Sequence, residues 1–228
     1  MSHDHSTDLM VQFSQEFWDD RYRSAQQLWS GQPNPQLVTH ATSLTPGDAL
    51  DVGCGEGADA IWLARQGWTV TGADISAVAL ERAAGHAAAC GDGIARRISW
   101  RQADLLSWEP GSQRYDLVSA QFMYLPAADL ESLHRRLAEA VRPGGTLLVV
   151  LHHPDSMHAG PGSGEGLVGT AAGRALLALA TDPRRLAAIL DASTFDILVA
   201  DAVPRQMTDR DGHPATAIDT VLLAARRH

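Results

Sequence analysis

Residues 50–57 read Leu-Asp-Val-Gly-Cys-Gly-Glu-Gly, and they predict the fold more directly than any other part of the chain. The apolar residues 49–52 predict a short buried strand. The glycines after it allow a sharp turn and let a ligand approach the backbone closely. Residues 58–66 then predict a helix. The spacing Gly53-x-Gly55-x-x-Ala58 also satisfies a loose dinucleotide fingerprint, so the glycines alone do not name a cofactor.

The rest of the chain continues this alternation of strand and helix. Further strands are predicted at 68–73, 98–102, 115–122, 145–152, 195–202 and about 216–225. Helices are predicted at 10–28, 36–43, 77–90, 129–141 and 182–191, with a glycine-rich loop at 159–170. Such alternation predicts an α/β fold, a mostly parallel sheet covered on both faces. The last two strands follow each other without room for a helix, so we expect an antiparallel hairpin at one edge.

Acidic residues follow the first three predicted strands. Asp74 ends the second strand, where a carboxylate can accept hydrogen bonds from a ribose placed over the glycine loop, and Asp104 follows the third. Asp51 and Glu56 stand in and beside the loop itself, where they disfavour a pyrophosphate and suit a cationic or amino group. The site is therefore expected to take a ligand with a ribose and a positive charge, which disfavours NAD and FAD.

Composition excludes several classes of function. All 18 cationic residues are Arg, so there is no lysine for a Schiff base or for a P-loop. The net charge of -9 argues against nucleic acid and anionic membranes as partners. The two cysteines have no metal-binding spacing, and no apolar run is long enough to be a signal peptide or a membrane span. We expect a cytoplasmic protein that acts on a small molecule, as a monomer or homodimer.

Five motifs, in order and suitably spaced, resemble those of the class I S-adenosylmethionine-dependent methyltransferases. They are Leu50-Asp-Val-Gly-Cys-Gly-Glu-Gly57, Gly72-Ala-Asp-Ile-Ser76, Ala103-Asp-Leu105, Tyr115-Asp-Leu-Val118 and Arg142-Pro-Gly-Gly-Thr-Leu-Leu148. The resemblance implies a Rossmann-like, seven-stranded, mostly parallel sheet with helices on both faces and an antiparallel last strand. It also implies one methyltransferase domain over residues 1–228, with a helical cover at 1–44 and a core at 45–228.

The same resemblance implies S-adenosylmethionine as the cofactor and assigns residues to it. Asp74 would hold the ribose hydroxyls and Asp104 the adenine amino group. The backbone at Gly53 and around Gln121 would hold the methionine end. The full set expected to bind the cofactor is Asp51, Gly53, Gly55, Asp74, Ile75, Asp104, Leu105 and Gln121.

The N-terminal segment is similar in plan to the cover of thiopurine and tellurite-resistance methyltransferases. Its aromatic residues are spaced as in an amphipathic helix. They fit packing against the rest of the protein as well as they fit the lining of a substrate pocket. Since only this segment could cover the cofactor, some of them should face the pocket. The expected substrate-binding residues are Trp18, Tyr22, Trp29 and Tyr124.

Two histidines, His152 and His153, end the fifth strand, at the sheet edge where open α/β folds bind ligands. Either is a candidate general base, because imidazole titrates near neutrality. Each could equally be a polar loop residue. A metal site formed with His158 is disfavoured because no carboxylate has suitable spacing, and we expect no metal.

The sequence thus favours direct in-line methyl transfer to a sulfur, nitrogen or oxygen atom of a small acceptor. Carbon also remains open as the acceptor atom. The alternative is a non-catalytic, S-adenosylmethionine-binding regulatory protein on the same fold, with an NAD-linked oxidoreductase as a distant third. Ser119-Ala-Gln-Phe-Met-Tyr124 replaces the Asn/Asp-Pro-Pro-Tyr motif of adenine or glutamine amide methylation, and there is no Pro-Cys nucleophile for cytosine methylation.

Overall fold

The computed structural model describes residues 14–123, 125, 127–158, 181–208 and 213–228. The chain divides into two compact units, Met1–Glu109 and Pro110–His228, and each has its own strands and helices. The predicted boundary between a cover at 1–44 and a core at 45–228 stays a prediction.

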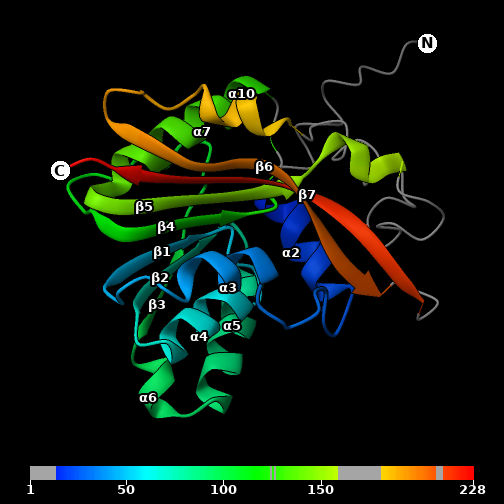
Figure 1. Cartoon of the computed structure of the whole chain (residues 1–228). Coiled ribbons are helices and arrows are strands. Elements are labelled where there is room, and N and C mark those ends of the chain that lie inside the picture. Colours follow the sequence, from blue (N-terminus) through cyan, green and yellow to red (C-terminus); the bar gives the residue numbers. More distant parts are fainter. Residues whose placement is uncertain (1–13, 124, 126, 159–180, 209–212) are drawn as a thin grey trace, which may run out of the picture. The chain divides into compact units, whose positions relative to one another are not determined.

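The first unit contains three parallel strands and the helices that connect them (Figure 1). Its strands are β1 (Asp48–Val52), β2 (Thr69–Asp74) and β3 (Ile98–Gln102). Its helices are α2 (Gln15–Arg23), α3 (Pro35–Ala41), α4 (Ala58–Arg65), α5 (Ala77–Ala89) and α6 (Asp92–Ala95). Since the strands are parallel, with Val52 opposite Ala73 and Asp74 opposite Gln102, their carboxyl ends meet at one edge.

Side-chain caps set where the helices of this unit begin. The Ser76 hydroxyl accepts from the Ala79 N–H at 3.1 Å and starts α5, directly after β2. Asn34 does the same for α3, where Pro35 follows as the first helical residue. These caps hold α5 and the N-terminal segment next to the ends of β1 and β2.

The second unit contains the remaining four strands, of which β6 and β7 form a long hairpin (Figure 1). Its strands are β4 (Tyr115–Gln121), β5 (Val141–His152), β6 (Phe195–Thr208) and β7 (Pro214–Arg226). Its helices are α7 (Ala127–Ala140), the 3₁₀ turn η1 (Pro154–His158) and α10 (Pro183–Ala187). Residues 146–151 of β5 are all buried, as expected for a strand with neighbours on both sides and a covered face.

The strands are ordered β3-β2-β1-β4-β5-β7-β6, and β7 is antiparallel to both β5 and β6. The predicted α/β class, with a seven-stranded, mostly parallel sheet and an antiparallel last strand, is therefore confirmed. The predicted edge hairpin is confirmed as well.

Several boundaries differ from the sequence prediction, among them the start of β5, which is at Val141 rather than residue 145. Helix α2 ends at Arg23 rather than near residue 28, because the Ser24 hydroxyl donates to the Arg21 carbonyl at 2.7 Å and the Leu28 N–H donates to Glu56. Helix α10 ends at Ala187, and its last turn tightens into i→i−3 hydrogen bonds. Strand β6 continues to Thr208 because it stays paired with β7 over its whole length. The predicted loop at 159–170 lies outside the described residues.

No helix in the described part of the chain is both long and apolar enough to cross a bilayer.

Candidate functional site

The glycine loop joins β1 to α4 and has the left-handed backbone that its sequence predicts. Gly53, Gly55 and Gly57 have φ values of 67°, 51° and 85°. Residues other than glycine are strained at these positive φ values. The Gly53 and Cys54 N–H groups donate to the Ala73 carbonyl at 2.8 and 3.1 Å, which fixes the loop to the end of β2.

Asp74, the last residue of β2, connects this loop to α5. Its Oδ2 accepts from the Gly55 N–H and its Oδ1 from the Ser76 N–H, both at 2.9 Å. Burial raises the pKa of Asp74, and the backbone hydrogen bonds from Ser76 and Gly55 oppose that rise. An ionised carboxylate offers about four acceptor positions, so Asp74 can accept hydrogen bonds from a ligand as well.

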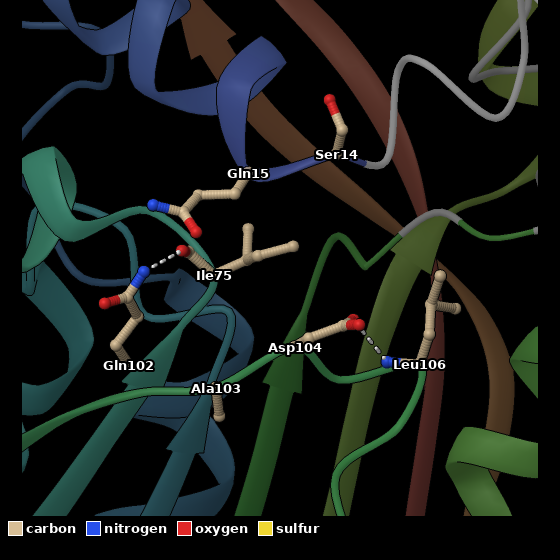
Figure 2. A pocket seen from close by; sticks show the side chains of 7 residues that line it. All are labelled: Ser14, Gln15, Ile75, Gln102, Ala103, Asp104 and Leu106. Carbon is tan, nitrogen blue, oxygen red and sulfur yellow. Dashed lines mark hydrogen bonds between the residues drawn. The ribbon is translucent and has the colours of Figure 1, made fainter.

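A cavity of about 480 Å³ lies beside Asp74, beyond the ends of β2 and β3 (Figure 2). Its volume is in the range of small-molecule sites. The Gln102 side chain donates to the Ile75 carbonyl at 3.2 Å and ties the two strand ends together. The lining residues are Ser14, Gln15, Ile75, Gln102, Ala103, Asp104 and Leu106.

Asp104 is both a turn residue and part of the cavity wall. Its Oδ1 accepts from the Leu106 N–H at 2.9 Å, which closes an Asx turn after β3 (Figure 2). Leu105 is buried at 6% exposure within the same turn. The functional and structural interpretations of Asp104 are therefore compatible.

Two predicted aromatic residues lie over the glycine loop. A Cβ added at Gly55 would be 2.9 Å from the Tyr22 hydroxyl and 3.3 Å from Trp29 Nε1. The Trp29 indole donates to the Tyr22 hydroxyl at 3.0 Å, although 43% of Trp29 is exposed. Trp18 instead packs on its own helix, edge-on to Phe17 and beside Tyr22. Tyr124 lies outside the described residues.

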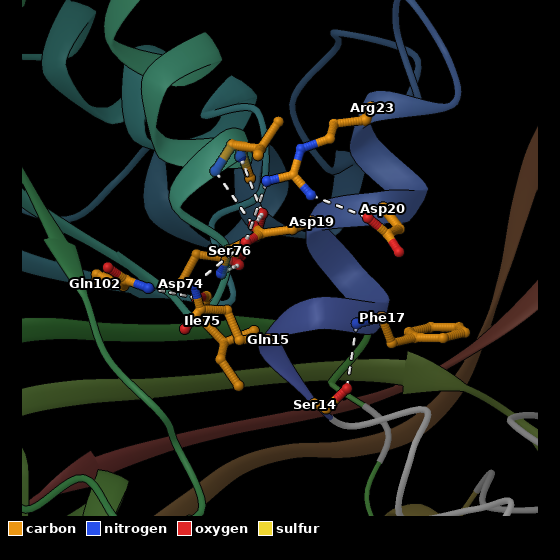
Figure 3. A network of polar contacts seen from close by, with 12 residues as sticks. Ser14, Gln15, Phe17, Asp19, Asp20, Arg23, Asp74, Ile75, Ser76 and Gln102 are labelled. Atoms are coloured by element: carbon orange, nitrogen blue, oxygen red, sulfur yellow. Dashed lines mark hydrogen bonds and ion pairs between the residues drawn. The ribbon is translucent and has the colours of Figure 1, made fainter.

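Two acidic residues, Asp19 and Glu56, hold the N-terminal segment in place, a role that sequence reasoning missed. Buried Asp19 of α2 accepts from the Ser76 hydroxyl at 2.6 Å and from the Val78 N–H at 3.4 Å, next to Asp74 (Figure 3). Glu56 accepts from the Leu28 and Trp29 N–H groups at 3.1 and 3.2 Å. No local spacing signals these bonds, because their partners are far apart in sequence.

Glu56 and Asp51 differ from the arrangement argued from sequence. The Glu56 carboxylate is engaged by the cover and by Arg82 at 3.0 Å, and it is only 6% exposed. Asp51 is 1% exposed, and burial raises its pKa well above the ordinary value. Both carboxylates are therefore buried, and their predicted effect on the choice of ligand stays a prediction.

The predicted residues of the second unit lie at the ends of β4 and β5. Gln121 ends β4 and donates to the Ser119 hydroxyl at 2.7 Å. His153 Nδ1 accepts from the Asp155 N–H at 3.2 Å, which is a local turn contact. His152 instead faces Asp219 of β7, with 3.7 Å between Nδ1 and Oδ1. Among the described residues there is no cluster of three or more His, Cys, Asp or Glu that could hold a metal.

Comparison with known proteins finds methyltransferases. The sequence profile of the family described as "Methyltransferase domain" matches residues 49–145. The chain is 29% identical over 153 residues to 2-heptyl-1-hydroxyquinolin-4(1H)-one methyltransferase of Mycobacteroides abscessus, covering 62% of this chain and 66% of the relative. It is 29% identical over 161 residues to "Probable thiol methyltransferase 2" of Arabidopsis thaliana, covering 67% and 69%.

Solved structures share the fold. TehB from Haemophilus influenzae matches with a TM-score of 0.63 and 18% identity, covering 94% of this chain and 67% of TehB. Magnesium protoporphyrin IX methyltransferase (ChlM) from Synechocystis PCC 6803 with bound SAH matches with a TM-score of 0.62 and 20% identity, covering 98% and 100%. The matched methyltransferase domain and the methyltransferases among the relatives support a class I S-adenosylmethionine-dependent methyltransferase.

Proposed function

We propose that this methyltransferase moves the methyl group of S-adenosylmethionine directly onto a nucleophilic atom of a small-molecule acceptor. The observation that carries the proposal is the cavity beside Asp74, about 480 Å³ in volume. It lies at the carboxyl ends of β2 and β3, the edge where α/β sheets bind ligands. The small-molecule names of the relatives support the same class of substrate.

The residues of the first unit fit the cofactor. In this proposal the free acceptor positions of Asp74 receive the two ribose hydroxyls, and Asp104 accepts from the adenine amino group. Ile75 and Leu105 supply apolar contacts to the adenine. The backbone of Gly53 and Gly55, and that of Gln121, hold the methionine end. Asp51 accepts a hydrogen bond from the Ala60 backbone at the start of α4, which holds the end of β1 to that helix, and in this proposal it also contacts the cofactor.

The N-terminal segment supplies the cover. Tyr22 and Trp29 lie over Gly55, where they exclude water from the cofactor and leave an aromatic surface for the acceptor. Trp18 supports Tyr22 from the same helix. Tyr124 completes the proposed acceptor set. Asp19 and Glu56 keep this cover ordered through the hydrogen bonds described above.

Methyl transfer requires little of the protein beyond positioning the acceptor against the cofactor. The bound cofactor supplies a methyl group that is already activated by its positive sulfur. The chain's own residues orient the acceptor in line with that methyl group and keep water out, which together account for much of the expected rate. A general base is needed only if the acceptor atom carries a proton at the working pH.

Two experiments test the proposal. Calorimetry with S-adenosylmethionine and its demethylated product should show binding of both, and absence of binding would contradict the cofactor assignment. A panel of acceptors then tests transfer: 2-heptyl-1-hydroxyquinolin-4(1H)-one, a simple phenol, thiophenol and a primary amine. Methylated product, detected by mass spectrometry, is the expected result. Cofactor binding without any methylated product from a broad panel would favour the non-catalytic alternative.

The small-molecule partner is part of this proposal. The cytoplasmic location, the monomeric or dimeric state and the absence of a nucleic-acid partner remain predictions from sequence.

A further inference from the structure

A second cavity, of about 380 Å³, lies along helix α2 in the first unit. Its volume is also in the range of small-molecule sites. Ser14, whose side chain caps α2, lines both this cavity and the one beside Asp74, so the two cavities meet at the start of the helix. The lining residues are Ser14, Glu16, Phe17, Asp20 and Arg21.

Helical spacing gives this cavity an aromatic wall and a cation. Residues four apart on a helix lie on the same side of it, so Phe17 and Arg21 are neighbours along α2. Both side chains are half-buried. The Phe17 ring points away from the polar network around Ser76 (Figure 3). The cavity therefore offers a ligand an apolar surface next to a guanidinium.

Arg21 is a cation without an anionic partner among the described residues. Its Nε is buried and makes no hydrogen bond there. Burial lowers the pKa of Arg21, and the contribution that opposes this shift comes from Tyr22 rather than from a carboxylate. The guanidinium nevertheless stays charged, and a charge removed from water without a partner is costly. An anionic ligand would relieve that cost.

The acids that line the cavity do not satisfy Arg21. Asp20 is engaged by Arg23, whose Nη1 donates to Oδ1 at 2.9 Å. Glu16 is exposed and lies in the first turn of α2, where a negative charge is favoured by the helix dipole. Since Glu16 faces water, salt and solvent screen its repulsion of a bound anion.

Trp18 holds the guanidinium without using its donors. Cζ of Arg21 lies over the Trp18 ring, 5.8 Å from the centroid, within reach of a cation–π interaction. The Trp18 ring also meets Phe17 edge-on, with 5.5 Å between their centroids. A guanidinium donates in its own plane, so contact with a ring leaves its N–H groups available to a ligand.

We propose that this cavity holds the carboxylate of the acceptor, that Arg21 recognises it, and that the acceptor is a small aromatic carboxylic acid. The inference rests on the proposed function and names the substrate class. The planar fork of a guanidinium matches a carboxylate and binds it through two parallel hydrogen bonds. The ring of Phe17 supplies the contact for the aromatic body of the acceptor.

The position of Arg21 on α2 favours the acceptor as the occupant. The next residue, Tyr22, has its hydroxyl 2.9 Å from where a Cβ on Gly55 would lie, over the loop proposed to hold the methionine end of the cofactor. One helical turn rises only about 5.4 Å. A molecule anchored at Arg21 therefore needs to extend only a short way along α2 to reach the glycine loop.

The first test concerns binding alone and needs no methyl transfer. Benzoate and benzamide have nearly the same shape but differ in charge. Each is titrated into the protein while NMR follows the Nε–H signal of Arg21, assigned with Arg21→Gln. Benzoate should shift this signal and benzamide should not. Added salt should weaken benzoate binding, because it screens a partly exposed charge pair. A signal that benzoate leaves unmoved overturns the inference.

Calorimetry gives the effect of the variants on the Kd for benzoate. Arg21→Gln should raise it about tenfold, because charge-assisted hydrogen bonds are lost, and Arg21→Lys should raise it less, because the charge remains. The matched control is Arg96→Gln, which removes an exposed arginine paired with Asp92 on α6 and should leave the Kd unchanged. Equal losses in Arg21→Gln and Arg96→Gln overturn the inference. If Arg21→Gln fails to fold, as judged by its thermal melt, Arg21→Lys and the benzamide comparison decide.

The second test asks whether the carboxylate belongs to the acceptor. Three acids are compared with their uncharged partners: 4-hydroxybenzoate with phenol, 4-mercaptobenzoate with thiophenol, and 4-aminobenzoate with aniline. In at least one pair the acid should be methylated with a kcat/KM about tenfold higher, and Arg21→Gln should abolish that preference. Equal use of acid and partner, or benzoate binding without methylation of any acid, overturns the assignment and leaves the proposed function intact.

The cofactor carries a carboxylate of its own, so its binding is measured in parallel. The Kd for S-adenosylhomocysteine should be the same in Arg21→Gln and in the wild type. A Kd raised about tenfold in Arg21→Gln would show that Arg21 binds the cofactor, and this overturns its assignment to the acceptor. Absence of cofactor binding in the wild type would instead contradict the proposed function itself.

Discussion

The two units of the chain differ in the groups that donate hydrogen bonds to their acidic side chains. In the first unit, backbone N–H groups donate to Asp74, Glu56 and Asp59. In the second unit, arginines do so: Arg142 pairs with Asp116 at 2.6 Å and Arg205 with Asp219 at 2.7 Å. The contrast has exceptions: Arg82 pairs with Glu56 and Arg23 with Asp20 in the first unit, and Asp191 of the second unit accepts from the Ser193 N–H.

This difference has a chemical consequence. A backbone amide satisfies a carboxylate's hydrogen bonds without cancelling its charge, whereas an arginine does both. In the first unit Asp74 is therefore held at the end of β2 by backbone N–H groups, which suits a ligand that donates hydrogen bonds from hydroxyls. The second unit holds neutralised pairs, which suit the positioning of other groups.

The largest effect is expected from the acid that adjoins the cavity. Asp74→Ala removes the carboxylate that accepts from Gly55 and Ser76 and that is proposed to bind the ribose. Cofactor binding should weaken by about 1–3 kcal/mol, as for lost hydrogen bonds to a charged group. Calorimetry measures this. The matched variant Asp116→Ala in the second unit should bind the cofactor normally, and equal losses in both variants would break the comparison.

The second expected effect concerns stability in acid. Burial lowers the pKa of His134 on α7 to about 4, from an ordinary 6.5, and neither ring nitrogen has a partner among the described residues. Between these pH values the unfolded state binds more protons, so wild-type stability rises with pH. His134→Leu removes that dependence and should stabilise the protein by up to about 3 kcal/mol near pH 4, with a much smaller gain at pH 8.

Urea unfolding at several pH values measures this gain. The half-buried His40, whose pKa burial also lowers, offers a comparison, and His40→Leu should flatten the profile less. A gain for His134→Leu that is the same at every pH would show that packing, rather than protonation, causes it.

The third expected effect has the opposite sign and belongs to the first unit. Burial raises the pKa of Asp59 from 3.8 to about 6, opposed by its hydrogen bond from the Asn34 N–H. The folded state therefore binds more protons between about pH 4 and 6, and stability is lost as pH rises through that window. Asp59→Asn should stabilise the cofactor-free protein by about 2 kcal/mol above pH 6, and hardly at pH 4, because an amide oxygen can still accept from Asn34.

The same urea series measures this effect, with the exposed Asp92→Asn as control. Parallel profiles for Asp59→Asn and the wild type would contradict the assignment. If Asp59→Asn raises stability above pH 6 and His134→Leu raises it near pH 4, the two residues limit stability at opposite ends of the pH range.

Sequence reasoning succeeded where the signal is local along the chain. The glycine loop, Asp74 at the end of β2 and Asp104 after β3 each follow a strand, so their places at one sheet edge could be predicted. It did not reveal that Glu56 and Asp51 are buried, or that Glu56 binds the N-terminal segment. Position in the chain locates a residue on an element, but only packing decides whether its side chain turns outward or becomes buried.

The sequence by itself determined the α/β class, the strand-end position of the acids and the resemblance to a methyltransferase. These follow from hydrophobic periodicity, glycine backbone freedom and motif order, all of which are encoded within short stretches. Only the tertiary structure decided that Asp19 caps α5 alongside Ser76, that Tyr22 and Trp29 lie over Gly55, and that Arg205 pairs with Asp219. These contacts join residues brought together by strand register and helix packing, which no local pattern in the sequence specifies.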